Sequence, residues 1–96
     1  MTIYQLLSPK NILLELEVDY KFDAINALVD TFVDVIENEL LEEIREAIIS
    51  REKIMSTGIG QGLAIPHGKT DAITQNYAAF ARLKEPIEFN SIDSKP

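Results

Sequence analysis

Residues 11–18 carry closely spaced leucine, isoleucine and valine side chains, with Glu15 and Glu17 directed the opposite way. This alternation has the two-residue period of a β-strand, so we expect a strand with one buried face. Ahead of it, residues 2–7 predict one or two helical turns. Ser8-Pro9 closes them, because the residue before a proline disfavours the α conformation.

Apolar side chains then recur at spacings of three and four, which predicts an amphipathic helix over residues 21–37. Asn38 is expected to end this helix and to cap a second one that continues to about Ser50. Residues 51–55 predict a short further helix, which places Arg51 in its first turn. The acidic residues opposite the apolar stripes are expected to form a solvated face.

The second half of the chain is less periodic. Residues 63–65 predict a short strand, residues 71–76 a polar connection, and residues 77–83 another strand. A third apolar segment spans residues 87–92, and Ser94-Lys95-Pro96 is typical of a turn that leads into a further element. Strands interleaved with helices predict an α/β domain whose sheet is thin and incomplete at the C-terminus.

Composition narrows the function classes. Ninety-six residues make one domain, and 46% hydrophobic with 26% charged residues is typical of a globular protein. No cysteine is present, which favours a reducing cytoplasmic setting, and no apolar run approaches the ~20 residues of a membrane span. A net charge of −7 argues against nucleic acid as a partner. Residues 1–50 hold eleven acids and three bases, whereas residues 51–96 hold five and six, so an anion is better tolerated in the second half.

Glycine marks the candidate site. All four glycines, Gly58, Gly60, Gly62 and Gly68, fall within eleven residues that also contain the only histidine, His67. Glycine serves where the backbone turns with positive φ or approaches another group closely, so we expect a shaped loop here. Pro66 favours an extended residue before it, which would present the His67 ring from the end of a strand, held in place and partly open to solvent.

Several chemistries do not fit this loop. A Walker A loop has four residues between its first glycine and Gly-Lys-Thr, but five separate Gly62 from Gly68-Lys69-Thr70. The spacing of Gly58, Gly60 and Gly62 also differs from the GxGxxG motif of dinucleotide-binding folds. One histidine without cysteine is a poor metal site, and no GxSxG elbow is present. We therefore expect neither a metal nor a cofactor.

A lone imidazole on a constrained loop suits nucleophilic attack on phosphorus, because neutral imidazole carries a free lone pair and forms a transferable phosphoramidate. Arg51, Ser56, Thr57 and the amides of the glycine loop could neutralise the phosphoryl oxygens. Other roles stay open. Arg51 could be a surface residue at a helix terminus, and the two hydroxyls could serve as local turn or cap groups.

The sequence from Arg51-Glu52 through the Ser56–Lys69 stretch, STGIGQGLAIPHGK, closely resembles the fructose/mannitol and nitrogen-regulatory (type 2) family of enzyme IIA domains of the bacterial phosphotransferase system. The resemblance extends over the whole chain through the stretches IYQLLSPKNILLELEVDY, LKEPIEF and IDSKP. It implies that His67 accepts a phosphoryl group from phospho-HPr and passes it to an enzyme IIB domain. It also implies that Arg51 helps to hold that group.

The same resemblance implies a mixed β-sheet flanked by helices, an α/β/α sandwich. Residues 1–96 then correspond to the N-terminal two thirds of one such domain. The remaining third of the family's domain would hold further sheet and helix and a second histidine, so exposed apolar surface could make this chain associate. Three functions follow as hypotheses: a phosphocarrier in sugar uptake, a nitrogen-type regulatory protein whose phosphorylation state controls partner binding, and a structural fragment without activity.

Overall fold

The computed structural model describes residues 8–68 and 77–91. In chain order the elements are η1 (Pro9–Asn11), β1 (Ile12–Leu16), α2 (Lys21–Asp30), α3 (Asn38–Ile54), β2 (Gly58–Gly60), β3 (Leu63–Ala64) and β4 (Phe80–Leu83). The predictions for residues 2–7, for the connection 71–76 and for Ile92 lie outside the described residues.

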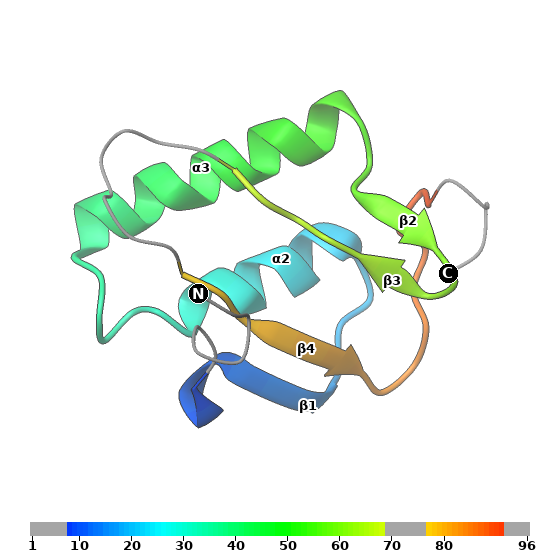
Figure 1. The fold of residues 1–96 in the computed structure, drawn as a ribbon, viewed down its shortest axis with the longest axis horizontal. Helices are drawn as coiled ribbons and strands as arrows, with labels where there is room; N and C mark the ends of the chain where they lie inside the picture. Colours follow the sequence, from blue (N-terminus) through cyan, green and yellow to red (C-terminus); the bar gives the residue numbers. More distant parts are fainter. Residues whose placement is uncertain (1–7, 69–76, 92–96) are drawn as a thin grey trace.

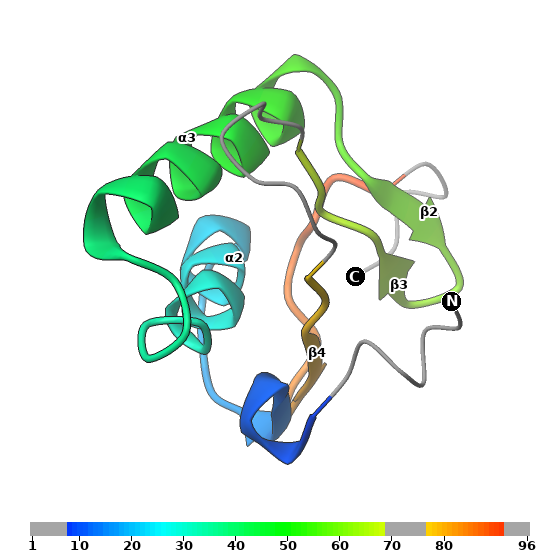
Figure 2. The same cartoon turned by 60° about the vertical axis from the view of Figure 1, so that its left-hand side comes forward.

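The elements form an α/β fold, as the sequence predicts. β1 pairs in parallel with β4, and β2 pairs antiparallel with β3, giving two two-stranded sheets within residues 8–68 and 77–91. Both views place α2 between α3 and the β1–β4 pair (Figures 1 and 2). The β2–β3 pair lies beyond the C-terminal end of α3, where the chain leaves that helix (Figure 1).

β1 is shorter and less regular than the alternation predicts. Glu15 has a φ of 58°, and the pairing with β4 shifts register between Leu13 and Leu16. Such an irregularity changes the face to which the following side chains point. Leu14, just before this irregularity, is 58% exposed, so the prediction of one continuous buried face is wrong at this position.

α2 ends at Asp30, well before the predicted end at residue 37. The Thr31 hydroxyl donates to the Leu28 carbonyl at 2.7 Å, and Asn11 Nδ2 donates to Thr31 Oγ1 at 3.0 Å. The Val35 amide then bonds the Phe32 carbonyl, so the chain continues as turns. These bonds stabilise the end of the helix at Thr31, and the bond from Asn11, 20 positions earlier, could not be indicated by the apolar spacing alone.

α3 is one uninterrupted helix where the sequence analysis predicts two. Asn38 is its first residue and Glu37 precedes it, so the prediction of an Asn38 cap is wrong. No glycine or proline occurs between Asn38 and Ile54, and a break at Ser50 would leave backbone groups without partners. Arg51 consequently lies in the last turn of a long helix and not in the first turn of a short one.

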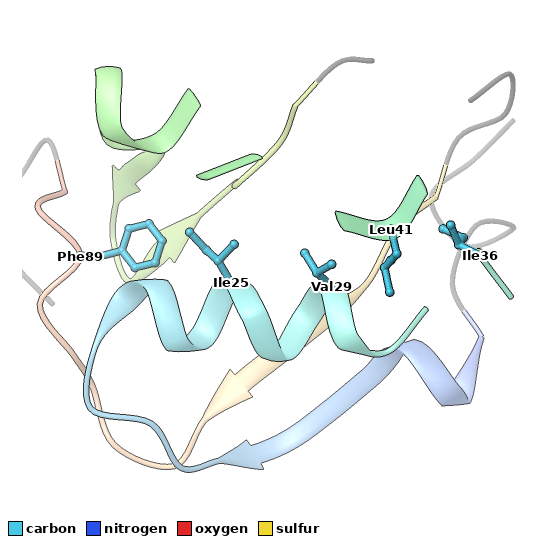
Figure 3. Close-up of a cluster of buried hydrophobic side chains, with 5 residues drawn as sticks. All are labelled: Ile25, Val29, Ile36, Leu41 and Phe89. Carbon is cyan, nitrogen blue, oxygen red and sulfur yellow. The ribbon is translucent and has the colours of Figure 1, made fainter. Parts of the chain in front are cut away.

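The core forms where the two helices meet the C-terminal segment. Figure 3 shows its five buried side chains, Ile25 and Val29 from α2, Ile36 from the turns, Leu41 from α3, and Phe89. Ile25 is the most enclosed, at 1% exposure. Because Phe89 joins this cluster, the segment after β4 is held against the helices without forming a strand of its own.

We expect Ile25→Ala to lower the free energy of unfolding by about 3 kcal/mol, since the substitution removes buried methyl groups and leaves a cavity. Urea unfolding followed by circular dichroism measures the loss. Ile54→Ala is the matched control, because Ile54 is 82% exposed and its loss should change stability by less than about 0.5 kcal/mol. Equal effects of the two substitutions would contradict the assignment of the core.

Candidate functional site

Gly58, Gly60 and Gly62 lie in a β-hairpin, where the sequence analysis predicts a shaped loop. Gly58 pairs with Ala64 and Gly60 with Leu63, so a strand precedes the one predicted at residues 63–65. The turn needs positive φ at three consecutive residues, 96° at Gly60, 57° at Gln61 and 78° at Gly62. Two of the three are glycine, which adopts such angles without strain.

The two outer glycines allow close approach of other segments. A Cβ at Gly58 would lie 2.3 Å from Ser91 Oγ, so the hairpin packs directly on the C-terminal segment. A Cβ at Gly68 would lie 2.9 Å from the backbone carbon of Ala47 and the backbone nitrogen of Ile48. The segment after β3 therefore runs against α3, as Figure 1 shows, and reaches that helix one turn before Arg51.

His67 lies on this segment and is exposed. Its Nδ1 is 2.8 Å from the Ile65 carbonyl oxygen. A carbonyl can only accept, so Nδ1 carries the proton in this bond, and the neutral ring then keeps its lone pair on Nε2. The geometry thus gives an accessible imidazole with a defined tautomer.

Arg51 caps the helix to which this segment packs. Its Nη1 donates to the Met55 carbonyl at 2.6 Å, one of the carbonyls beyond the last turn of α3. A helix C-terminus carries partial negative charge, which opposes the approach of an anion. Arg51 and Lys53 are the basic residues of this last turn, and the Arg51 guanidinium offsets the partial charge at the Met55 carbonyl.

Ser56 and Thr57 make local contacts. Ser56 Oγ donates to the Phe89 carbonyl at 2.7 Å and accepts from the Gly58 amide at 3.1 Å. Thr57 is buried, and both its amide and its hydroxyl donate to Glu52. The sequence leaves two roles open for these hydroxyls, namely binding of the phosphoryl group or local turn and cap contacts. The observed bonds agree with local turn and cap contacts.

A buried carboxylate that the sequence analysis did not single out organises the start of the hairpin. The Glu52 side chain is fully buried; Oε1 accepts from Thr57 Oγ1 at 2.5 Å, and Oε2 accepts from the Thr57 amide at 2.8 Å and from Lys21 Nζ at 3.2 Å. Lys21 Nζ also donates to the Phe89 carbonyl and lies 5.1 Å from the centre of the Phe89 ring. Desolvation acts to raise the pKa of Glu52, but the bonds from Thr57 and Lys21 outweigh it and lower the pKa.

An open apolar groove of about 490 Å³ lies between α2, β3 and β4. It reaches Pro66, but His67 is not part of its lining. Large apolar side chains are also exposed on and before the hairpin, namely Ile54, Met55, Ile59, Leu63 and Ile65. Among residues 8–68 and 77–91, no group of three or more histidine, cysteine or acidic side chains is placed to hold a metal ion.

Comparison with known proteins places this geometry in a family. The family "Phosphoenolpyruvate-dependent sugar phosphotransferase system, EIIA 2" matches residues 5–96. The chain belongs to this EIIA family. Its fold is that of the nitrogen regulatory protein IIA-Ntr from Neisseria meningitidis, whose crystal structure superposes with a TM-score of 0.85 at 35% identity. That match covers 98% of this chain and 64% of the other.

Relatives of both functional kinds occur within the EIIA family. The chain is 37% identical to a nitrogen regulatory protein of Bradyrhizobium diazoefficiens, and the match covers all of this chain and 62% of the relative. It is 35% identical, again over its whole length, to 15% of the fructose-specific EIIABC component of Bacillus subtilis. The chain therefore spans less than two thirds of the length of these relatives. None of the helices described in this EIIA chain is both long enough and apolar enough to cross a bilayer.

Proposed function

We propose that this chain is a phosphocarrier domain in which His67 accepts a phosphoryl group from phospho-HPr and passes it to an enzyme IIB domain. The observation that carries the proposal is the exposed His67 ring, whose Nδ1–H is held by the Ile65 carbonyl. Membership of the EIIA family supports phosphotransfer as the general activity. We propose fructose- or mannitol-type sugar uptake as its physiological role and the cytoplasm as its location.

The transfer uses the free lone pair on His67 Nε2. That lone pair attacks phosphorus, a new N–P bond forms, and the N–P bond of the donor phosphohistidine breaks with its electron pair returning to the donor ring. The phosphorylated His67 ring keeps its Nδ1 proton, and the Ile65 carbonyl stabilises the positive charge that develops on the ring. Arg51 and hairpin amides bear the charge of the phosphoryl oxygens.

Incubation with phosphorylated HPr tests this function. We expect one phosphoryl group per chain, labile in acid, with nitrogen-15 NMR placing it on Nε2. A subsequent incubation with a purified enzyme IIB domain should remove it. An unlabelled chain, or a phosphate on a hydroxyl, would overturn the proposal.

The alternative is a nitrogen-type regulatory protein that receives the same phosphoryl group but changes its binding partners in response. The similarity to the Bradyrhizobium and Neisseria nitrogen regulatory proteins favours it as strongly as the fructose relatives favour transport. Transfer onward to enzyme IIB separates the two. A chain that is phosphorylated but does not pass the group to any IIB domain would support regulation.

Arg51→Lys is expected to slow the transfer about tenfold without unfolding the domain, because a point charge does not reproduce the planar fork of a guanidinium on phosphoryl oxygens. Stopped-flow or quench measurements of the transfer from phospho-HPr give the rate. Lys53→Met is the matched control, since it removes the other cation of the same helical turn and should leave the rate within twofold. An unchanged rate in Arg51→Lys would refute the role of the arginine.

A further inference from the structure

A continuous series of hydrogen bonds links the interior of the protein to the imidazole. It begins at the buried Glu52 carboxylate, which accepts from both the amide and the hydroxyl of Thr57. The carbonyl of Thr57 accepts from the Ile65 amide at 3.1 Å. The carbonyl of Ile65 accepts from His67 Nδ1 at 2.8 Å.

The hairpin by itself is too small to hold this geometry. β2 has three residues and β3 has two, and a lone two-stranded pair of this kind is marginally stable in water. Thr57 extends the ladder by one bond and ties it to Glu52. Glu52 directly follows Arg51 in the last turn of α3, so the same contact sets the position of the hairpin relative to the arginine.

We propose that Thr57 and Glu52 are positioning residues for His67. The buried carboxylate orients Thr57, Thr57 orients Ile65, and the Ile65 carbonyl keeps the proton on Nδ1 so that Nε2 stays free to react. Lys21 completes the arrangement, because it neutralises Glu52 and anchors it to the Phe89 carbonyl. This role rests on the proposed phosphorylation of His67.

Thr57→Val tests the inference, since valine has the shape of threonine but no hydroxyl. We expect the population of the Nδ1–H tautomer to fall, as read from the nitrogen-15 shifts of the unphosphorylated ring. We also expect kcat for transfer from phospho-HPr to drop about tenfold, the effect of about one lost charge-assisted hydrogen bond, with KM within twofold. Thr57→Ser keeps the hydroxyl and should retain most of the wild-type Nδ1–H tautomer population and of kcat.

Asn11→Ala is the control for a loss of stability alone. Asn11 is buried and bonded to Thr31, and its contacts lie on η1 and the turns after α2, away from the hairpin. It should lower stability while leaving the tautomer and kcat unchanged. If Thr57→Val does not fold, Glu52→Gln is measured in the same way, because glutamine retains the shape and one acceptor.

An unchanged tautomer in the folded variant, or an equal change in Asn11→Ala, would overturn the inference. The tautomer measurement needs no phosphoryl donor. Failure of the wild-type chain to take up phosphate would therefore refute the proposed function, and the positions of the protons on His67 would still decide the role of Thr57.

Discussion

Replacing His67 with alanine is expected to abolish acid-labile phosphorylation completely. His67 is the only histidine in the sequence, so no second imidazole can take over the phosphoryl group. The loss should be chemical and not structural. The ring is exposed, and its one described hydrogen bond is to a carbonyl two residues earlier, so stability should change by less than about 0.5 kcal/mol.

His67→Gln separates the two properties of the ring. A glutamine amide can donate to a backbone carbonyl but has no lone pair able to attack phosphorus. We expect it to be as inactive as His67→Ala and to unfold at the same urea concentration as the wild type. Acid-labile label that survives in either variant would show that the acceptor lies elsewhere.

The position of the candidate site could be predicted from the sequence because its signals are local. Glycine, proline and histidine within a few residues of one another indicate a shaped segment whatever the rest of the chain does. The structure places His67 after a short strand and exposes it, as the sequence predicts. Positive φ at Gly60 and Gly62 also agrees with the expected use of glycine.

The support for the site could not be predicted because it depends on contacts between distant residues. Lys21 donates a hydrogen bond to Glu52, which is 31 positions away in the sequence, and Ser56 donates one to the Phe89 carbonyl, which is 33 positions away. Periodicity treats Glu52 as one more acidic residue among many, and only the packing of α2 against the end of α3 shows that it is buried. The early end of α2 is likewise stabilised by a non-local bond, from Asn11 to Thr31 across 20 positions.

The contacts of Glu52 and Lys21 also explain how residues 87–91 are held in place, although the apolar pattern there predicts no clear element. Residues 87–91 form no strand, yet the Phe89 carbonyl accepts from both Lys21 and Ser56, and its ring packs in the core. One buried acid therefore connects the helices, the hairpin and the C-terminal segment. Its removal should therefore affect stability more than the removal of an exposed charged side chain.

Glu52→Gln is expected to lower the free energy of unfolding by about 3 kcal/mol at pH 7, because it leaves Lys21 without its counter-charge in a site where Lys21 is only 12% exposed. Urea unfolding measures the loss. Glu46→Gln is the matched control, since Glu46 is an exposed acid of the same helix and should cost less than about 0.5 kcal/mol.

The loss of stability caused by Glu52→Gln should depend on pH in a defined direction. The pKa of Glu52 is lower in the folded protein than the ordinary value of 4.5, despite the opposing effect of desolvation, because Thr57 and Lys21 bind the charged form. The unfolded chain therefore takes up the proton first as the pH falls. The stabilisation is complete above pH 4.5 and disappears as the pH drops through the folded pKa, so the difference between wild type and Glu52→Gln should shrink below pH 4.5. A difference that stays constant or grows on acidification would mean that Glu52 is not held as a carboxylate.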